Sequence, residues 1–87
     1  RLLFEYMQMK NDKYHQCFSF GHILCTARMY DLAEQFYERM LKELEPDHPL
    51  IAELWGSKGL VKKAKGEIDI SFQLLSKSLE KYEQMGD

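Results

Sequence analysis

Proline and glycine are scarce in this sequence, which has two prolines and five glycines in 87 residues. Proline breaks a helix interior and glycine weakens it, so their scarcity permits long helices. Long apolar runs are also missing, and no stretch approaches the roughly 20 apolar residues that a membrane-spanning helix needs. The sequence therefore favours a helical chain that does not cross a membrane.

An excess of basic residues is absent too. Twelve lysines and arginines stand against 14 acidic residues, for a formal net charge of -2. Proteins that bind nucleic acids usually present a clear basic surface, so we expect no nucleic-acid partner.

Only two cysteines occur, Cys17 and Cys25. On one helix their Cα atoms would lie about 12 Å apart, whereas a disulfide spans at most about 7 Å. We therefore expect free thiols, which fit a cytoplasmic protein. Because the sequence begins at Arg1 without a methionine, we also expect a piece of a longer protein.

The chain contains an internal repeat. A shift of 38 residues aligns Gly21 with Gly59 and Ala33 with Ser71. Small residues at these positions would let a neighbouring helix approach the backbone closely. The shift also aligns Cys17 with Trp55, Tyr30 with Ile68, Asp31 with Asp69, Tyr37 with Leu75, Met40 with Ser78 and Leu41 with Leu79.

Apolar spacing predicts two helices in each half of the chain. We expect these helices over about 14–27, 31–44, 48–65 and 68–84, with Asp47 as the N-cap of the third and Gly66 ending it. Residues 1–10 would form a short helix that packs on the first unit, followed by a turn at Asn11 and Asp12. The prediction is an all-α chain with a packing helix or junction over 1–12 and two units over 13–49 and 50–87.

Each unit resembles the tetratricopeptide repeat, whose pattern is W-x2-L-G-x2-Y followed by A-x3-F and a later proline. The first unit has Cys17, Phe20, Gly21, Leu24, Ala33, Tyr37 and Met40, with Pro46 beyond; the second has Trp55, Lys58, Gly59, Lys62, Ser71, Leu75 and Ser78. The junction Asp47-His48-Pro49 and the run from Tyr30 to Tyr37 look similar to the kinesin light chain-like branch of that family.

This resemblance implies antiparallel helix pairs stacked as a right-handed α-solenoid, a scaffold that holds another protein or peptide in a concave groove. The groove positions are His15, Phe18, Ser19, His22, Cys25 and Thr26 in the first unit, and Glu53, Gly56, Ser57, Leu60 and Lys63 in the second. The family's clamp of Lys, Asn and Arg for a peptide carboxylate is missing. We therefore expect a neutral or mildly polar ligand.

Two departures from the pattern concern the second unit, where Lys58 and Lys62 replace residues that are usually apolar. They would weaken the packing of the third helix on the fourth unless the lysine stems lie along the surface. Together with Lys63 and Lys65 they form a basic cluster near a helix C-terminus, where the helix dipole favours cations.

No catalytic or cofactor motif is present, so we expect neither an enzyme nor a bound cofactor. Nothing resembles a nucleophile elbow or a phosphate-binding loop. His22 and Cys25 could share a helix face, but a zinc site needs further ligands that the sequence does not supply.

Several alternatives remain open. Leu3-Phe4-Glu5-Tyr6-Met7 is similar to a helix that joins mono-ADP-ribosyltransferase domains to such repeats, so the chain could be a non-catalytic regulatory or linker segment of a larger enzyme. It could also be a plain four-helix bundle. Exposed ends, Leu2 to Met9 and Phe72 to Tyr82, could drive self-association.

Overall fold

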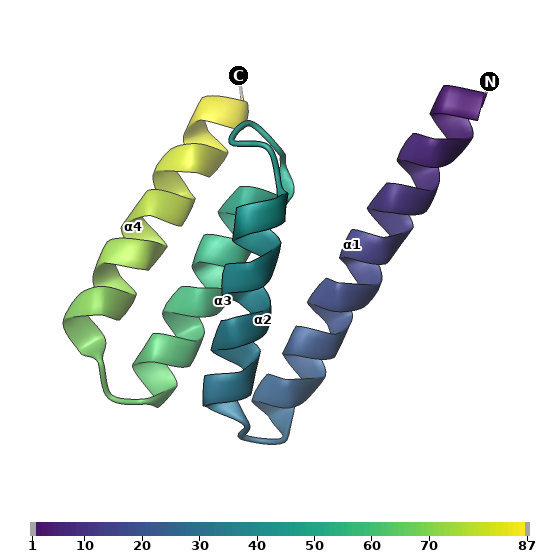
Figure 1. Ribbon diagram of the computed structural model, residues 1–87. Helices are drawn as coiled ribbons and strands as arrows, with labels where there is room; N and C mark the ends of the chain where they lie inside the picture. Colours follow the sequence, from purple (N-terminus) through teal and green to yellow (C-terminus); the bar gives the residue numbers. More distant parts are fainter. Residues whose placement is uncertain (1, 87) are drawn as a thin grey trace.

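A computed structural model describes the backbone of residues 2–86 and the side chains of residues 13–86. They form four helices, α1 (Leu2–Thr26), α2 (Tyr30–Glu43), α3 (Leu50–Ala64) and α4 (Ile68–Met85), which run alternately down and up (Figure 1). No strand occurs among the described residues. The prediction of an all-α chain is confirmed, and the last three helices begin and end within two residues of the predicted bounds.

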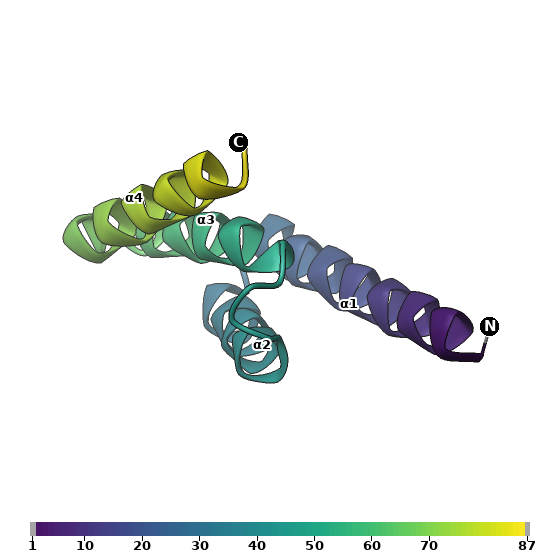
Figure 2. The same ribbon diagram turned by 90° about the horizontal axis from the view of Figure 1, so that it is seen from above.

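Helix α1 is longer than predicted. It runs without interruption through Asn11 and Asp12, so the turn expected there is wrong. Asn and Asp lower helix propensity by well under about 1 kcal/mol each, which is too little to break a helix flanked by good helix formers. The first half of α1 extends beyond the other helices (Figures 1 and 2). The packing expected of residues 1–12 lies outside the described side chains.

The turns after α1 and α3 have the same geometry. Arg28 and Gly66 both adopt a left-handed backbone, with φ of 63° and 86°. The N–H of Met29 donates to Leu24 O at 2.8 Å, and the N–H of Glu67 donates to Lys62 O at 2.9 Å. In each case the left-handed residue also donates to the carbonyl three residues before it. This is the Schellman ending of a helix, which usually employs glycine, and the two turns are related by the shift of 38 residues.

The connection from α2 to α3 is held by His48. Its Nδ1 accepts a hydrogen bond from the N–H of Leu50 at 3.1 Å, and its ring meets Tyr14 of α1 edge to face at 5.6 Å. Asp47 was expected to cap α3, but the structure shows no such bond, and the imidazole satisfies the first N–H of the helix instead. One side chain therefore fixes both the start of α3 and the position of α1 beside it.

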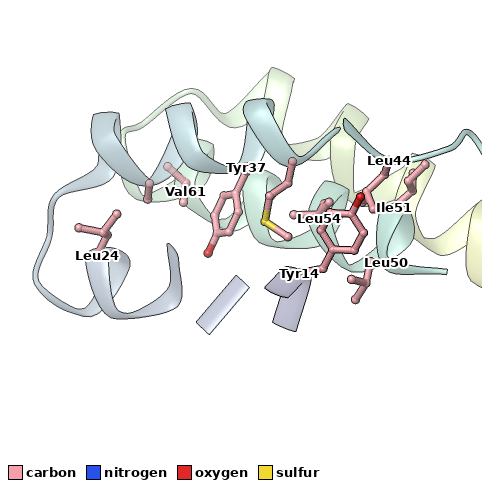
Figure 3. Packing of buried hydrophobic residues seen from close by; sticks show 10 residues of the cluster. Tyr14, Leu24, Tyr37, Leu44, Leu50, Ile51, Leu54 and Val61 are labelled. Carbon is pink, nitrogen blue, oxygen red and sulfur yellow. The ribbon is translucent and has the colours of Figure 1, made fainter. Parts of the chain in front are cut away.

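The core lies where α1, α2 and α3 meet (Figure 3). Tyr37 of α2 and Leu54 of α3 are its largest fully buried side chains. The other members are Tyr14 and Leu24 of α1, Ala33 and Met40 of α2, Leu44, and Leu50, Ile51 and Val61 of α3. Trp55 is half-buried against this cluster, and the ammonium of Lys77 lies 5.4 Å from its ring centroid.

Helices α2 and α4 lie on opposite sides of α3 (Figure 2). The contact between α3 and α4 is more extensive than that between α1 and α2 or between α2 and α3. The part of α4 that is buried against α3 is small and polar, namely Ser71 and Ser78. The large apolar residues of α4 instead remain exposed, namely Ile68, Phe72, Leu75, Leu79 and Tyr82.

Lys58 and Lys62 of α3, and Lys65 at its C-cap, form ion pairs with α2. Lys58 pairs with Glu38 at 3.2 Å, Lys62 pairs with Glu34, and Lys65 pairs with Asp31 at 2.6 Å. Lys62 also reaches Glu67, the residue before α4, at 3.0 Å. The contact between α3 and α4 is nevertheless extensive, so the two lysines do not weaken it.

Candidate binding groove

A cleft of about 460 Å³ opens between α1, α3 and α4, with Tyr37 of α2 reaching it through the gap between α1 and α3. Its surface is predominantly apolar. The lining residues are Phe18, His22 and Cys25 of α1, Tyr37 of α2, Glu53, Gly56, Ser57, Leu60 and Val61 of α3, and Leu75, Ser78 and Tyr82 of α4. Ligand pockets are commonly about 300–1,000 Å³, so this cleft could hold one or two side chains of a partner.

The structure brings together seven of the positions predicted for a groove: Phe18, His22, Cys25, Glu53, Gly56, Ser57 and Leu60. The remaining positions, His15, Ser19, Thr26 and Lys63, are exposed and do not line the cleft. The Thr26 hydroxyl is turned back onto its own helix, where it donates to the carbonyl of His22 at 3.1 Å. The part of α1 that lines the cleft is thus the face shared by Phe18, His22 and Cys25.

Five lining residues were not predicted: Tyr37, Val61, Leu75, Ser78 and Tyr82. Sequence reasoning assigned the groove only to the first helix of each unit, whereas α4 forms one wall of this cleft. The sequence did contain a signal that α4 contributes to the cleft. Ser78 is small, whereas the matching residue of the first unit, Met40, is large. A small residue on one helix facing a glycine on the next lets the two helices approach closely, so α4 can lie beside the cleft.

Gly56 of α3 and Ser78 of α4 are in close contact. A Cβ atom added to Gly56 would lie 3.1 Å from Ser78 Oγ. At the matching positions the first unit has the large residues Phe18 and Met40. The Ser78 hydroxyl donates to the carbonyl of Ala52 at 2.7 Å, which holds it against α3. The small residues of the second unit therefore let α4 pack closely on α3 at positions where the first unit has bulky side chains.

Tyr37 supplies a polar atom to an otherwise apolar part of the cleft. Its hydroxyl lies 3.6 Å from Cys25 Sγ, and its ring is tilted against Phe18 with 6.0 Å between centroids. Burial, followed by the contact with Cys25, raises the pKa of Tyr37 well above its ordinary value of 10.0. A tyrosine hydroxyl is neutral at physiological pH with its ordinary pKa, and this rise in pKa extends the neutral form to more alkaline pH.

Among residues 13–86, the only carboxylate in the cleft lining belongs to Glu53, which is exposed. Burial, and then the negative charge of Glu53, raise the pKa of the Tyr82 hydroxyl. This electrostatic effect places Glu53 near the α4 wall. No lysine or arginine lines the cleft among the described residues.

The basic residues of α3 occupy its other side. The pKa values of Lys62 and Lys65 are raised above 10.5, first by their side-chain contacts with Glu34 and Asp31 respectively. Burial opposes ionisation of Glu34, but Lys62 and Lys65 outweigh it and hold its pKa below 4.5. Most of the basic cluster noted in the sequence is thus engaged by α2 carboxylates.

Within residues 13–86, no three His, Cys, Asp or Glu side chains come close enough to hold a metal ion. Cys17 and Cys25 are free thiols, as predicted. None of the described helices combines the length and apolar character that a bilayer span requires. Comparison with protein-family models, with curated proteins and with solved structures finds no match to this chain.

Proposed function

We propose that the chain is a tetratricopeptide-like repeat module that holds a segment of another protein in the cleft between α1, α3 and α4. The observation that carries this proposal is the cleft itself, an apolar hollow of about 460 Å³ with few polar groups at defined places. Binding sites for small groups and peptide side chains have this character. The proposed role is non-catalytic.

Matching positions in the two halves support the repeat. Tyr37 lies on Gly21 and Leu75 lies on Gly59, and these pairs correspond under the shift of 38 residues. Arg28 and Gly66 end α1 and α3 with the same hydrogen bonds. The agreement of both the turn and the glycine contact favours a repeat over a coincidental four-helix bundle. We infer a right-handed solenoid of two units, because stacked helix pairs of this type wind into a superhelix.

The test is a comparison of partners retained by the wild type and by Leu60→Glu. Leu60 is 60% exposed at the cleft, so a glutamate there should alter the binding surface without unfolding the protein. His22→Glu adds the same charge on the α1 side. Leu32→Glu is the matched control, since Leu32 is also exposed but lies on α2 outside the cleft.

Partners that bind the wild type and Leu32→Glu but are lost from both cleft variants would support the proposal. If every partner is retained equally by all four proteins, the cleft is not the binding surface. Circular dichroism of each variant establishes that the helices are intact before the comparison is made.

A second proposal, self-association, is favoured by the outer face of α4. Phe72 and Leu79 are 72% and 61% exposed. Their matching residues on α2 are Glu34, which pairs with Lys62 of α3, and Leu41, which packs against the core. On α2, this face contacts α3, the first helix of the next pair. On α4, the corresponding face is apolar and exposed. A second copy of the chain could stack there as α3 stacks on α2.

Sedimentation over a range of concentrations tests this proposal. We expect the wild type to associate at high concentration and Phe72→Glu with Leu79→Glu to remain monomeric. A wild type that stays monomeric throughout would reject self-association while leaving the cleft proposal intact.

A further inference from the structure

The two long sides of α3 carry opposite kinds of charge. On the side of α2, Lys58, Lys62 and Lys65 pair with acidic residues. On the side of the cleft, the only charged residue that α3 contributes is Glu53, and it makes no ion pair with any described residue. The one acidic side chain that lines the cleft among the described residues is therefore free to pair with a cation, although α3 is rich in lysine.

The interior of the cleft is neutral and apolar. Phe18, Leu60 and Leu75 are among its lining residues, and the Tyr37 hydroxyl is uncharged at physiological pH. A charged side chain buried here would lose its hydration without gaining a partner, which is costly. An uncharged aliphatic or aromatic side chain would instead gain by leaving water.

These two features specify different parts of a ligand. Taking the proposed function as given, we propose that the cleft selects protein segments in which a large apolar side chain is followed directly by a lysine or arginine. The apolar side chain lies in the cleft against Leu60 and Leu75, and the cation lies beside Glu53. Charge complementarity of this kind adds selectivity more than affinity.

Three blocked dipeptides test this proposal as probes: acetyl-Phe-Lys-amide, acetyl-Phe-Gln-amide and acetyl-Phe-Glu-amide. Each is titrated into isotopically labelled protein while amide chemical shifts are recorded. We expect shifts at Gly56, Ser57 and Leu60, with the lysine probe binding most tightly and the glutamate probe least. An exposed ion pair is worth up to about 1 kcal/mol, so the lysine probe should bind about two- to fivefold more tightly than the glutamine probe.

Variant Glu53→Gln should abolish the difference between the lysine and glutamine probes and leave the glutamine probe's affinity unchanged. Glu80→Gln removes an exposed carboxylate from α4 that does not line the cleft, and it should preserve the difference. Raising the salt concentration should reduce the advantage of the lysine probe in the wild type, because exposed charges are screened.

The possible failures can be told apart. If all three probes shift the cleft residues with equal affinity, the charge selection is wrong and the proposed cleft function stands. If no probe shifts them, or the shifts lie elsewhere, both this proposal and the proposed cleft function are overturned.

Discussion

Tyr37 of α2 lies directly on Gly21 of α1: a Cβ atom at position 21 would come within 2.6 Å of Tyr37 Cε1. Real Cβ atoms essentially never approach another heavy atom so closely. The tyrosine ring is fully buried and cannot move aside easily. The absence of a side chain at Gly21 therefore sets the distance between α1 and α2.

This contact predicts that Gly21→Ala destabilises the protein. Alanine is intrinsically better than glycine in a helix by about 1 kcal/mol, but overpacking a core typically costs about 1–3 kcal/mol. We expect a net loss in the free energy of unfolding, measured by urea denaturation. Combining Gly21→Ala with Tyr37→Leu should cost less than the sum of the two single changes, since leucine occupies the matching position on Gly59. Strict additivity would contradict the proposed contact.

The left-handed turns predict a pair of opposite effects. Arg28 has φ of 63° and carries the steric penalty of a side chain in that conformation. Arg28→Gly should therefore stabilise the protein by about 1 kcal/mol, which corresponds to roughly 4–8 °C in melting temperature for a domain of this size. Gly66→Ala should destabilise it by a similar amount, and because no atom lies within 4 Å of that Cβ, backbone strain alone would be responsible. A fall in melting temperature for Arg28→Gly would show that the arginine side chain contributes more than its backbone costs.

The contacts of His48 predict that its ring nitrogen contributes to the stability of the protein. His48→Ala removes the acceptor for the N–H of Leu50 and the edge contact with Tyr14, so we expect a loss of about 1–2 kcal/mol. His48→Asn places an amide oxygen close to where Nδ1 lies, and it should recover part of the loss. Thermal unfolding of the three proteins is the measurement. Equal losses for Ala and Asn would mean that the hydrogen bond contributes nothing measurable.

The ion pairs between α2 and α3 predict a dependence on pH. The pKa values of Glu34 and Asp31 are held below their ordinary values of 4.5 and 3.8, in spite of burial at Glu34, by contacts with Lys62 and Lys65. As the pH falls below about these values, the unfolded chain binds protons more readily than the folded one, so stability falls. Above that window the stabilisation is fully present.

Glu34→Gln should flatten this acid dependence and lower stability at pH 7 by about 0.5–1 kcal/mol. The matched control is Glu80→Gln, which removes a carboxylate outside any ion pair among residues 13–86. Urea denaturation at several pH values makes the comparison. An identical acid dependence in the wild type and Glu34→Gln would show that the pairs do not contribute.

Much of the fold followed from local sequence signals. The apolar spacing, the prolines at 46 and 49 and Gly66 were sufficient to place α2, α3 and α4, because helix ends are decided by nearby residues. The prediction of a turn at Asn11 and Asp12 was wrong because nearby residues did not decide the structure there. A weak local preference was overridden by the helix on both sides of it.

The sequence by itself determined the helices, the 38-residue correspondence and the small residues at Gly21, Gly59 and Ala33, since each depends on residue type and spacing along one chain. Only the tertiary structure decided which face of each helix meets which neighbour. It placed Lys58 and Lys62 of α3 against α2, packed Ser78 of α4 on Gly56, and left Phe72 exposed. Those outcomes depend on the distances and rotations between helices, which side-chain volumes at several positions set together and no local pattern encodes.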